Sequence, residues 1–83
     1  MKWVVYVLEG DSGRHYIGMT NDLPRRFAQR QRGHTPTTRR LGGNLRVVAQ
    51  RDFASAAEAR LVERRLKSWK SPAKAIAWLG GER

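Results

Sequence analysis

The pattern of apolar residues along the chain predicts three strands. Residues 2–8 (KWVVYVL) and residues 45–52 (LRVVAQRD) are rich in β-branched or aromatic side chains, which favour strands. A second short strand is predicted at residues 14–19, after the turn-forming sequence GDSG at residues 10–13. The first two strands therefore form a predicted hairpin, and the third strand follows much later in the chain.

A helix start signal follows the predicted hairpin. Asn21 or Asp22 can cap a helix over residues 22–31, because short polar side chains accept hydrogen bonds from the first helical amides. Leu23 and Phe27 lie four residues apart and would share the apolar face of this helix.

A second helix is predicted over residues 55–69. Ser55 and Glu58 stand three residues apart, which is the spacing of a capping box. The apolar stripe of this helix consists of Ala59, Val62, Leu66 and Trp69.

Ser71 and the proline that follows it predict the start of a last helix over residues 72–79, which ends at two glycines. The expected fold class is therefore α/β in the broad sense, of the α+β type. It consists of a small three-stranded antiparallel sheet flanked by helices. No repeat or linker divides the sequence, so residues 1–83 are expected to form a single domain.

Charge narrows the function classes. The chain has 17 Lys and Arg against 7 Asp and Glu, a net charge of +10 at pH 7. Such a field attracts polyanions, of which nucleic acid is the commonest, although arginine-rich solvated faces can also arise from composition alone. The long predicted loop at residues 32–43 carries Arg39, Arg40 and His34, which suits contact with a phosphate backbone.

The chain contains no cysteine, which excludes disulfides and thiolate zinc sites. The apolar run near the N-terminus is too short for a signal-peptide core or a membrane span. We therefore expect a soluble cytoplasmic protein that does not enter membranes, and we expect a monomer.

Carboxylates are few, and one of them has no evident structural role. Glu63 lies at the edge of the apolar stripe of the second helix, among arginines. It can form an ordinary ion pair with Lys67, four residues later, or it can serve a functional site. Both interpretations stay open at this point.

Aromatic residues also allow two interpretations. Trp3, Trp69 and Trp78 can stack on bases, but tryptophans at strand and helix-stripe spacing usually belong to a core. Tyr6 and Tyr16, the two tyrosines of the chain, would be ordinary strand residues if no other motif accompanied them.

Five features in chain order resemble the GIY-YIG nuclease superfamily. They are Val5-Tyr6-Val7, Tyr16-Ile17-Gly18, Thr20, the segment from Leu23 to Arg26, and Glu63. The resemblance covers nearly the whole chain and is closest to small stand-alone bacterial members labelled predicted endonucleases. More distantly, the chain is similar to the nuclease domain of the excision-repair subunit that makes the 3′ incision.

The resemblance implies a role for each matched residue. Tyr6 and Tyr16 would lie on neighbouring strands and share one face of the sheet, and Gly18 would lie where the backbone approaches the site closely. Arg26 would hold the scissile phosphate. Glu63 would be the one protein ligand of a single divalent metal, Mg²⁺ or Mn²⁺.

The implied reaction is in-line attack of water on a phosphodiester, with the metal and Arg26 neutralising the charge that develops on the phosphate. Tyr6 would act as general base or orient the water, and Tyr16 would position the phosphate or the water. A phenol with an ordinary pKa of about 10 needs help from cations to act as a base at neutral pH. The expected nucleic-acid contacts are Gly18, Arg25, Arg30, Arg39, Arg40 and Lys74.

The carboxylate inventory agrees with a single metal. A two-metal nuclease needs clustered carboxylates, whereas one Mg²⁺ can be bound through one carboxylate, with water and substrate phosphate as its other ligands. The two histidines have no paired spacing, which argues against zinc.

One position departs from the family pattern. Four residues after Arg26 the family usually has His or Tyr, whereas this chain has Arg30. Arginine cannot accept a proton at neutral pH, although it can still bind a phosphate. His34 is an alternative source of an imidazole or simply a loop residue, and Lys74 is a possible stand-in for a polar residue that the family often has after the glutamate helix.

We therefore expect a metal-dependent DNA endonuclease that recognises branched, flapped or damaged DNA, with RNA open as a second substrate. The alternative is a nucleic-acid-binding module on the same scaffold that has lost catalysis. The endonuclease interpretation predicts that Tyr6, Tyr16, Arg26 and Glu63 converge on one concave basic surface, with residues 32–43 at its rim.

Overall fold

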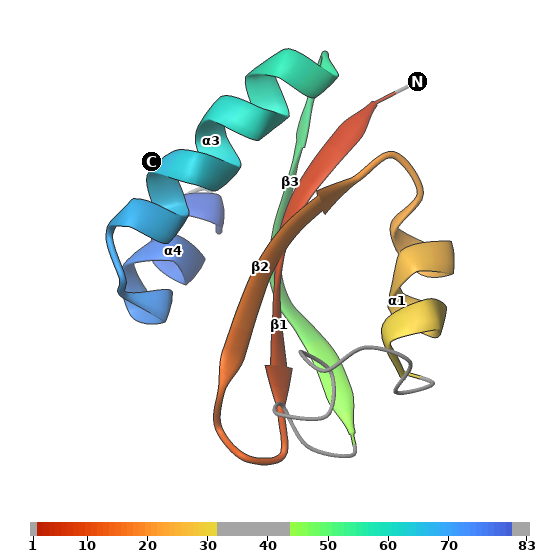
Figure 1. The fold of residues 1–83 in the computed structure, drawn as a ribbon, viewed down its shortest axis with the longest axis vertical. Coiled ribbons are helices and arrows are strands. Elements are labelled where there is room, and N and C mark those ends of the chain that lie inside the picture. The colour runs from red at the N-terminus through yellow and green to blue at the C-terminus, as the bar shows by residue number, and fades with distance from the viewer. Residues whose placement is uncertain (1, 32–43, 81–83) are drawn as a thin grey trace.

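The computed structural model describes residues 2–31 and 44–80, and it shows an antiparallel sheet with helices on both faces (Figure 1). The elements in chain order are β1 (Trp3–Gly10), β2 (His15–Thr20), α1 (Leu23–Gln31), β3 (Leu45–Phe53), α3 (Ala56–Ser68) and α4 (Pro72–Leu79). The predicted fold class is confirmed. Every predicted strand and helix is present, with its ends displaced by at most two residues.

The sheet has the order β2-β1-β3, and β1 pairs antiparallel with both neighbours. The hairpin turn between β1 and β2 is closed by hydrogen bonds from the amides of Gly10 and Gly13 to the carbonyls of Arg14 and Gly10. Gly13 has φ of 85°, a conformation that a side chain would strain. Tyr6 lies opposite Gly18, which fixes the register of the hairpin.

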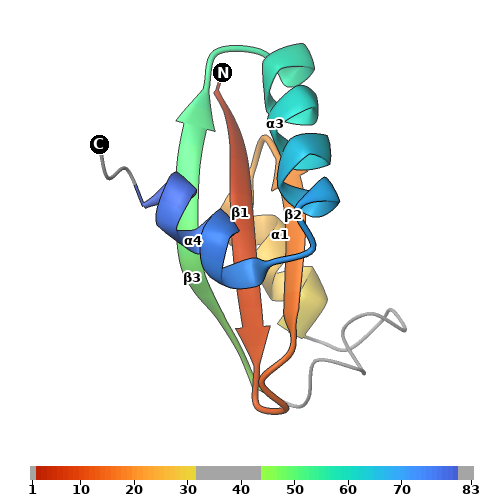
Figure 2. The same ribbon diagram turned by 90° about the vertical axis from the view of Figure 1, so that its left-hand side faces the viewer.

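The two faces of the sheet are covered differently. Helices α3 and α4 pack together on one face, here called the core face, and α1 lies alone on the other, here called the α1 face (Figure 2). Because side chains alternate along a strand, β1 serves both faces. Its Val5 and Val7 lie on the core face, and Tyr6 and Leu8 lie on the α1 face.

A register shift in β3 changes which residues face the core. Val7 pairs with Ala49, but Leu8 pairs with Val47, so β3 carries one extra residue at this point. Such a bulge reverses the alternation of side chains along the strand. As a result Leu45 and Val47 pack on the α1 face, whereas Ala49 and Phe53 pack on the core face.

The helix starts agree with the sequence. Asp22 caps α1 by accepting a hydrogen bond from the amide of Arg25 at 3.2 Å. Ser55 and Ser71 accept from the amides three residues later at the starts of α3 and α4. The carboxylate of Glu58 accepts from the amide of Ala54, one residue before the amide of Ser55 that a capping box would use.

One core prediction is wrong. Trp69 was expected to complete the apolar stripe of α3, but it is 37% exposed and follows the end of the helix. The stripe is buried at Ala59 and Leu66. Lys70, which comes next, has φ of 53°, so the helix ends at the fourth stripe position and Trp69 is not held against the core.

No helix within residues 2–31 and 44–80 is long and apolar enough to cross a membrane.

Candidate active site

Tyr6 and Tyr16 lie on one face of the sheet, on neighbouring strands. Tyr16 pairs with Leu8, two residues from Tyr6, so both phenols point toward α1. Their ring centroids are 6.4 Å apart and the rings are tilted by 48°. The prediction that the two tyrosines share a face is confirmed.

Gly18 creates the space in which the two rings meet. A Cβ atom at this position would lie 2.6 Å from the hydroxyl of Tyr6 and 2.8 Å from the ring of Tyr16. Real Cβ atoms do not tolerate such distances, so any side chain here would displace the tyrosines. The glycine of the second motif is therefore required by the tyrosine arrangement, and it does not need a special backbone angle.

Arg30 joins the tyrosines to α1. Its Nη2 donates a hydrogen bond to the hydroxyl of Tyr16 at 2.8 Å, and its guanidinium carbon lies 4.4 Å from the centroid of the same ring. A hydrogen bond between Arg30 and Tyr6 is also among the interactions that act on the Tyr6 phenol. The residue that departs from the family pattern thus organises both motif tyrosines.

The two phenols differ in exposure. Tyr6 is 1% exposed, and burial raises its pKa above 10, with a further increase from neighbouring Tyr16. The positive charges of Arg30 and Arg26 act in the opposite direction but do not cancel the effect of burial. Tyr16 is half-buried, on the edge strand. Tyr6 is therefore protonated at neutral pH and has little access to solvent.

Arg26 lies one helical turn before Arg30 on α1, close enough for its charge to act on Tyr6. Its side chain is exposed and lines a polar hollow of about 440 Å³ together with Thr20, Asn21, Asp22, Arg25 and Gln29. The hollow opens at the start of α1, where the positive end of the helix dipole adds to the charge of the arginines. Its size and charge suit a phosphate group.

Glu63 lies on α3, which packs against β2 from the core face. Its Oε2 is 3.3 Å from the ammonium nitrogen of Lys67, so the ion pair considered from the sequence is present. The Lys67 nitrogen is also 5.8 Å from the centroid of Tyr16. Glu63 is thus linked to Tyr16 through Lys67 across the β2 edge, although the two belong to opposite faces of the sheet.

The side chains near this edge can accommodate one divalent cation. Within the described residues no three His, Cys, Asp or Glu side chains come together, so Glu63 would be the single carboxylate ligand of the metal implied by the family resemblance. A cation held by one carboxylate takes its other ligands from water and substrate phosphate, so the donor set fits a single Mg²⁺ or Mn²⁺. The carboxylate oxygen that Lys67 now contacts would have to be released, and Lys67 is half-exposed and able to move.

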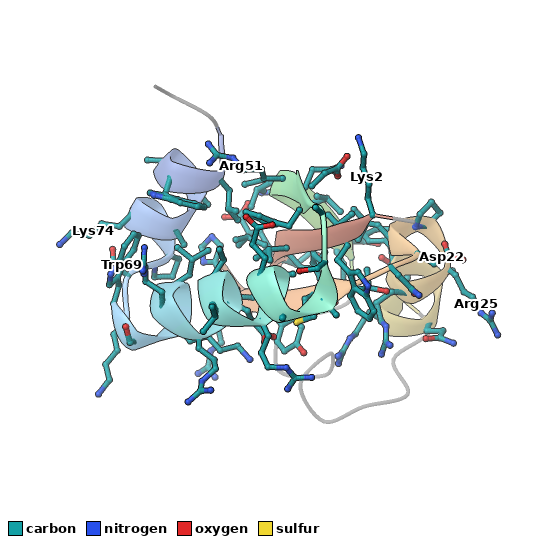
Figure 3. The ribbon with its side chains drawn as sticks, turned by 90° about the horizontal axis from the view of Figure 1, so that it is seen from above. Lys2, Asp22, Arg25, Arg51, Trp69 and Lys74 are labelled. Atoms are coloured by element: carbon teal, nitrogen blue, oxygen red, sulfur yellow. The ribbon has the colours of Figure 1, made fainter. Side chains whose placement is uncertain are left out.

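Other expected contacts are not brought to this edge. Arg25 points away from the sheet into solvent, at the α1 end of the molecule, and Lys74 lies at the opposite end beside Trp69 (Figure 3). Arg39, Arg40 and the rest of residues 32–43 lie outside the described residues. The structure therefore groups Tyr6, Tyr16, Gly18, Arg26 and Arg30 on the α1 face. Glu63 belongs to the helix on the opposite face and approaches the tyrosines only through Lys67, so the predicted convergence of Tyr6, Tyr16, Arg26 and Glu63 on one surface is not observed.

Sequence reasoning missed the position of Lys67. It was considered only as a partner of Glu63, yet its nitrogen also lies over the Tyr16 ring. The helical spacing of Glu63 and Lys67 could not reveal this, because the contact depends on how α3 packs against β2.

A glycine allows the two tyrosines to form a tilted pair, and the adjoining helix supplies arginines beside them. This arrangement is that of a small α+β domain of the nuclease type. The model of the family described as "GIY-YIG catalytic domain" matches residues 2–76, so the chain belongs to that family. Membership implies nuclease-type activity on a nucleic-acid substrate. Nucleases of this family generally use divalent metals.

Relatives of similar length support the assignment. A UPF0213 protein of Cupriavidus pinatubonensis is 40% identical over 73 residues, which cover 88% of this chain and 81% of that protein. A UPF0213 protein of Cronobacter sakazakii is 38% identical over 66 residues, covering 80% and 70% of the two chains. The solution NMR structure of a UPF0213 protein from Bacillus halodurans is 31% identical, with a TM-score of 0.59, and covers 98% of this chain and 88% of that chain.

Proposed function

We propose that the protein is a metal-dependent DNA endonuclease that hydrolyses phosphodiester bonds in branched, flapped or damaged DNA. The observation that carries the proposal is the contact of Arg30 with both motif tyrosines beside Arg26, because it orients two hydroxyls next to two cations on one face of the sheet. All described helices and strands belong to the sheet and the helices packed on it, so none of them forms a separate module for recognising base sequence. DNA shape is therefore the feature that would guide cleavage.

Arg26 would bind the scissile phosphate. It is exposed, it lines the polar hollow at the start of α1, and its charge already reaches the tyrosine pair. A guanidinium matches two phosphate oxygens with two parallel hydrogen bonds. The charge that develops on these oxygens during hydrolysis strengthens the contact in the transition state.

Tyr16 would position the attacking water through its hydroxyl group. Because Arg30 donates to the Tyr16 oxygen, the hydroxyl proton is directed elsewhere and can contact a phosphate oxygen or water. Arg30 and Lys67 lie against the ring and would help to hold it in place. Tyr6, which is buried and has a raised pKa, is better suited to hold Tyr16 in place than to act as the base expected from the sequence.

Glu63 would hold the divalent cation. When bound, such an ion neutralises phosphate charge and orients the scissile group. Lys67 contacts the same carboxylate and would compete with the cation for that carboxylate. The Lys67 side chain would therefore turn toward Tyr16 when the metal binds.

The test is cleavage of flap, branched and linear duplex DNA with and without Mg²⁺ or Mn²⁺. Glu63→Gln keeps the size of the side chain but removes the charge that holds the cation, so cleavage should fall by about two orders of magnitude or more. Binding at one stated salt concentration should persist, because removing a negative charge lessens repulsion of phosphate. Arg26→Ala should reduce cleavage strongly and binding slightly, since it removes a contact that is strongest in the transition state.

The second candidate is a binding module that has lost catalysis. The Glu63–Lys67 ion pair favours it, because the expected metal ligand is occupied by a cation of its own helix. If the unaltered protein binds branched DNA but cuts no substrate with either metal, and Glu63→Gln behaves identically, the endonuclease proposal is wrong and the binding module replaces it.

A further inference from the structure

A shallow hollow lies where the end of α3 meets α4, away from α1. It has a volume of about 590 Å³ and is lined by Trp69, Lys74, Ala77 and Trp78. Figure 3 shows Trp69 and Lys74 beside each other at the end of the molecule opposite Asp22 and Arg25. Neither residue contributes to the site around the tyrosines.

The two tryptophans of this hollow are not equivalent. Trp78 stacks on Phe53 with 6.4 Å between ring centroids, and Arg51 lies 4.5 Å from the Trp78 ring centroid while donating to its carbonyl oxygen. Trp69 is 37% exposed, and the described residues place it in no aromatic contact. Trp69 therefore offers ring surface to a ligand, whereas Trp78 forms the wall behind it.

The sequence around the hollow is rich in positive charge. Residues 64–81 contain five Lys and Arg and no Asp or Glu. Among the described residues, neither Lys70 nor Lys74 forms an ion pair. An aromatic ring beside uncompensated ammonium groups is how proteins bind a base and its phosphate.

A smaller hollow is lined both by Tyr16 and by residues of the turn next to Trp69. It has a volume of about 210 Å³, and its lining includes Tyr16, Lys67 and Lys70. These residues lie between Arg30, which contacts Tyr16, and the turn that carries Trp69. A nucleic-acid strand leaving the tyrosines would meet Lys67, then Lys70, and then Trp69.

We propose that this corner binds an unpaired strand of DNA, with a base stacked on Trp69 and its phosphate held by Lys74. Bases in a duplex are stacked on one another, so only an unpaired base can offer its face to the ring. A second copy of the chain would bring another charge of +10 to the same surface and is disfavoured by repulsion. This inference rests on the proposed function, because it makes a single-stranded arm part of the endonuclease substrate.

The test measures binding without cleavage, in EDTA and at one stated salt concentration, with a short oligothymidylate and an abasic oligonucleotide of equal length. The unaltered protein should bind the oligothymidylate about tenfold more tightly, since stacking requires bases. Trp69→Leu should abolish most of this preference and the quenching of tryptophan fluorescence, while binding of the abasic strand stays unchanged. Trp69→Phe should retain part of the preference.

Lys74→Ala should weaken binding of both oligonucleotides and lower the slope of log K against log salt by about 0.7. Leu61→Ala and Lys2→Ala are matched controls: Leu61 is an exposed apolar residue of α3, and Lys2 is an exposed lysine far from Lys74 (Figure 3). Neither control should change the preference for bases.

The inference is overturned if Trp69→Leu, shown to be folded by its thermal unfolding, keeps the full preference for bases. It is also overturned if the unaltered protein binds both oligonucleotides equally. Absence of cleavage with every metal, together with a base preference that depends on Trp69, would refute the endonuclease proposal and leave this binding site standing.

Discussion

The two faces of the sheet are built for different tasks. On the core face, α3 and α4 bury Val5, Val7, Ala59, Leu66, Ala75 and Leu79 to 2% exposure or less. On the α1 face a nine-residue helix with no buried residue of its own covers two tyrosines and the leucines beside them. Stability is concentrated where two helices pack, which leaves the other face able to carry cations and hydroxyls.

Strand β1 makes this division possible. Consecutive residues Tyr6 and Val7 are almost equally buried, yet one enters the tyrosine pair and the other the apolar core. Substitutions at neighbouring positions of this strand should therefore have different consequences. Three experiments can test the division of tasks between the two faces of the sheet.

The largest effect is expected from Arg30→Met. The change removes the hydrogen bond to Tyr16 and the cation over its ring, so the hydroxyl loses its orientation. Cleavage should fall about a hundredfold, as is typical when a reacting group is misplaced. Arg14→Met, in the hairpin turn, removes the same charge at an exposed position and is the control. If cleavage falls equally in both variants, Arg30 contributes only its positive charge and does not act by orienting Tyr16.

A moderate effect on stability is expected from Val7→Ala. Val7 is fully buried on the core face, and the loss of two methyl groups there should lower the free energy of unfolding by about 2 kcal/mol. Val4→Ala makes the same change on the α1 face, where Val4 is only partly buried, and should cost less. Urea unfolding would measure both, and cleavage per folded molecule should stay unchanged for Val7→Ala. Equal losses for the two variants would contradict the division between the faces.

The smallest effect concerns alkaline pH. Burial raises the pKa of Tyr6 above 10, so below pH 10 both folded and unfolded chains keep this proton. Above pH 10 the unfolded chain releases it while the folded chain retains it, and the stabilising contribution is lost as pH rises through the folded pKa. The free energy of unfolding should therefore fall less steeply above pH 10 in Tyr6→Phe than in the unaltered protein. Identical slopes would show that the phenol titrates as it does in the unfolded chain.

Local signals in the sequence were sufficient for most of the fold. The caps at Asp22, Ser55 and Ser71 act on amides within three residues, so they could be predicted without knowledge of tertiary contacts. The bulge at Val47 and Val48 could not be predicted, because no glycine marks it and its cause lies in pairing with β1.

The candidate site was predictable in part. The shared face of Tyr6 and Tyr16 follows from strand register, which the short hairpin restricts. The contact of Arg30 with Tyr16 joins residues 14 positions apart, and it depends on how α1 lies across the sheet. The resemblance led to the expectation that Arg30 lacks a proton-transfer role, but it gave no indication that Arg30 would hold the tyrosines.

The bulge in β3 has a consequence for how this strand evolves. Leu45 and Val47 contact the α1 face, whereas Ala49 and Phe53 contact the core face, although all four have odd positions. The two halves of β3 are therefore under different packing constraints, which change at the bulge. The first half must fit the residues around the tyrosines, and the second half must fit α3 and α4. Loss of the extra residue at the bulge would leave Val47 opposite Leu8 and Ala49 opposite Val7, so both halves of the strand would keep their faces. A deletion elsewhere in β3 would exchange the faces of part of the strand, so deletions should be tolerated better at the bulge than on either side of it.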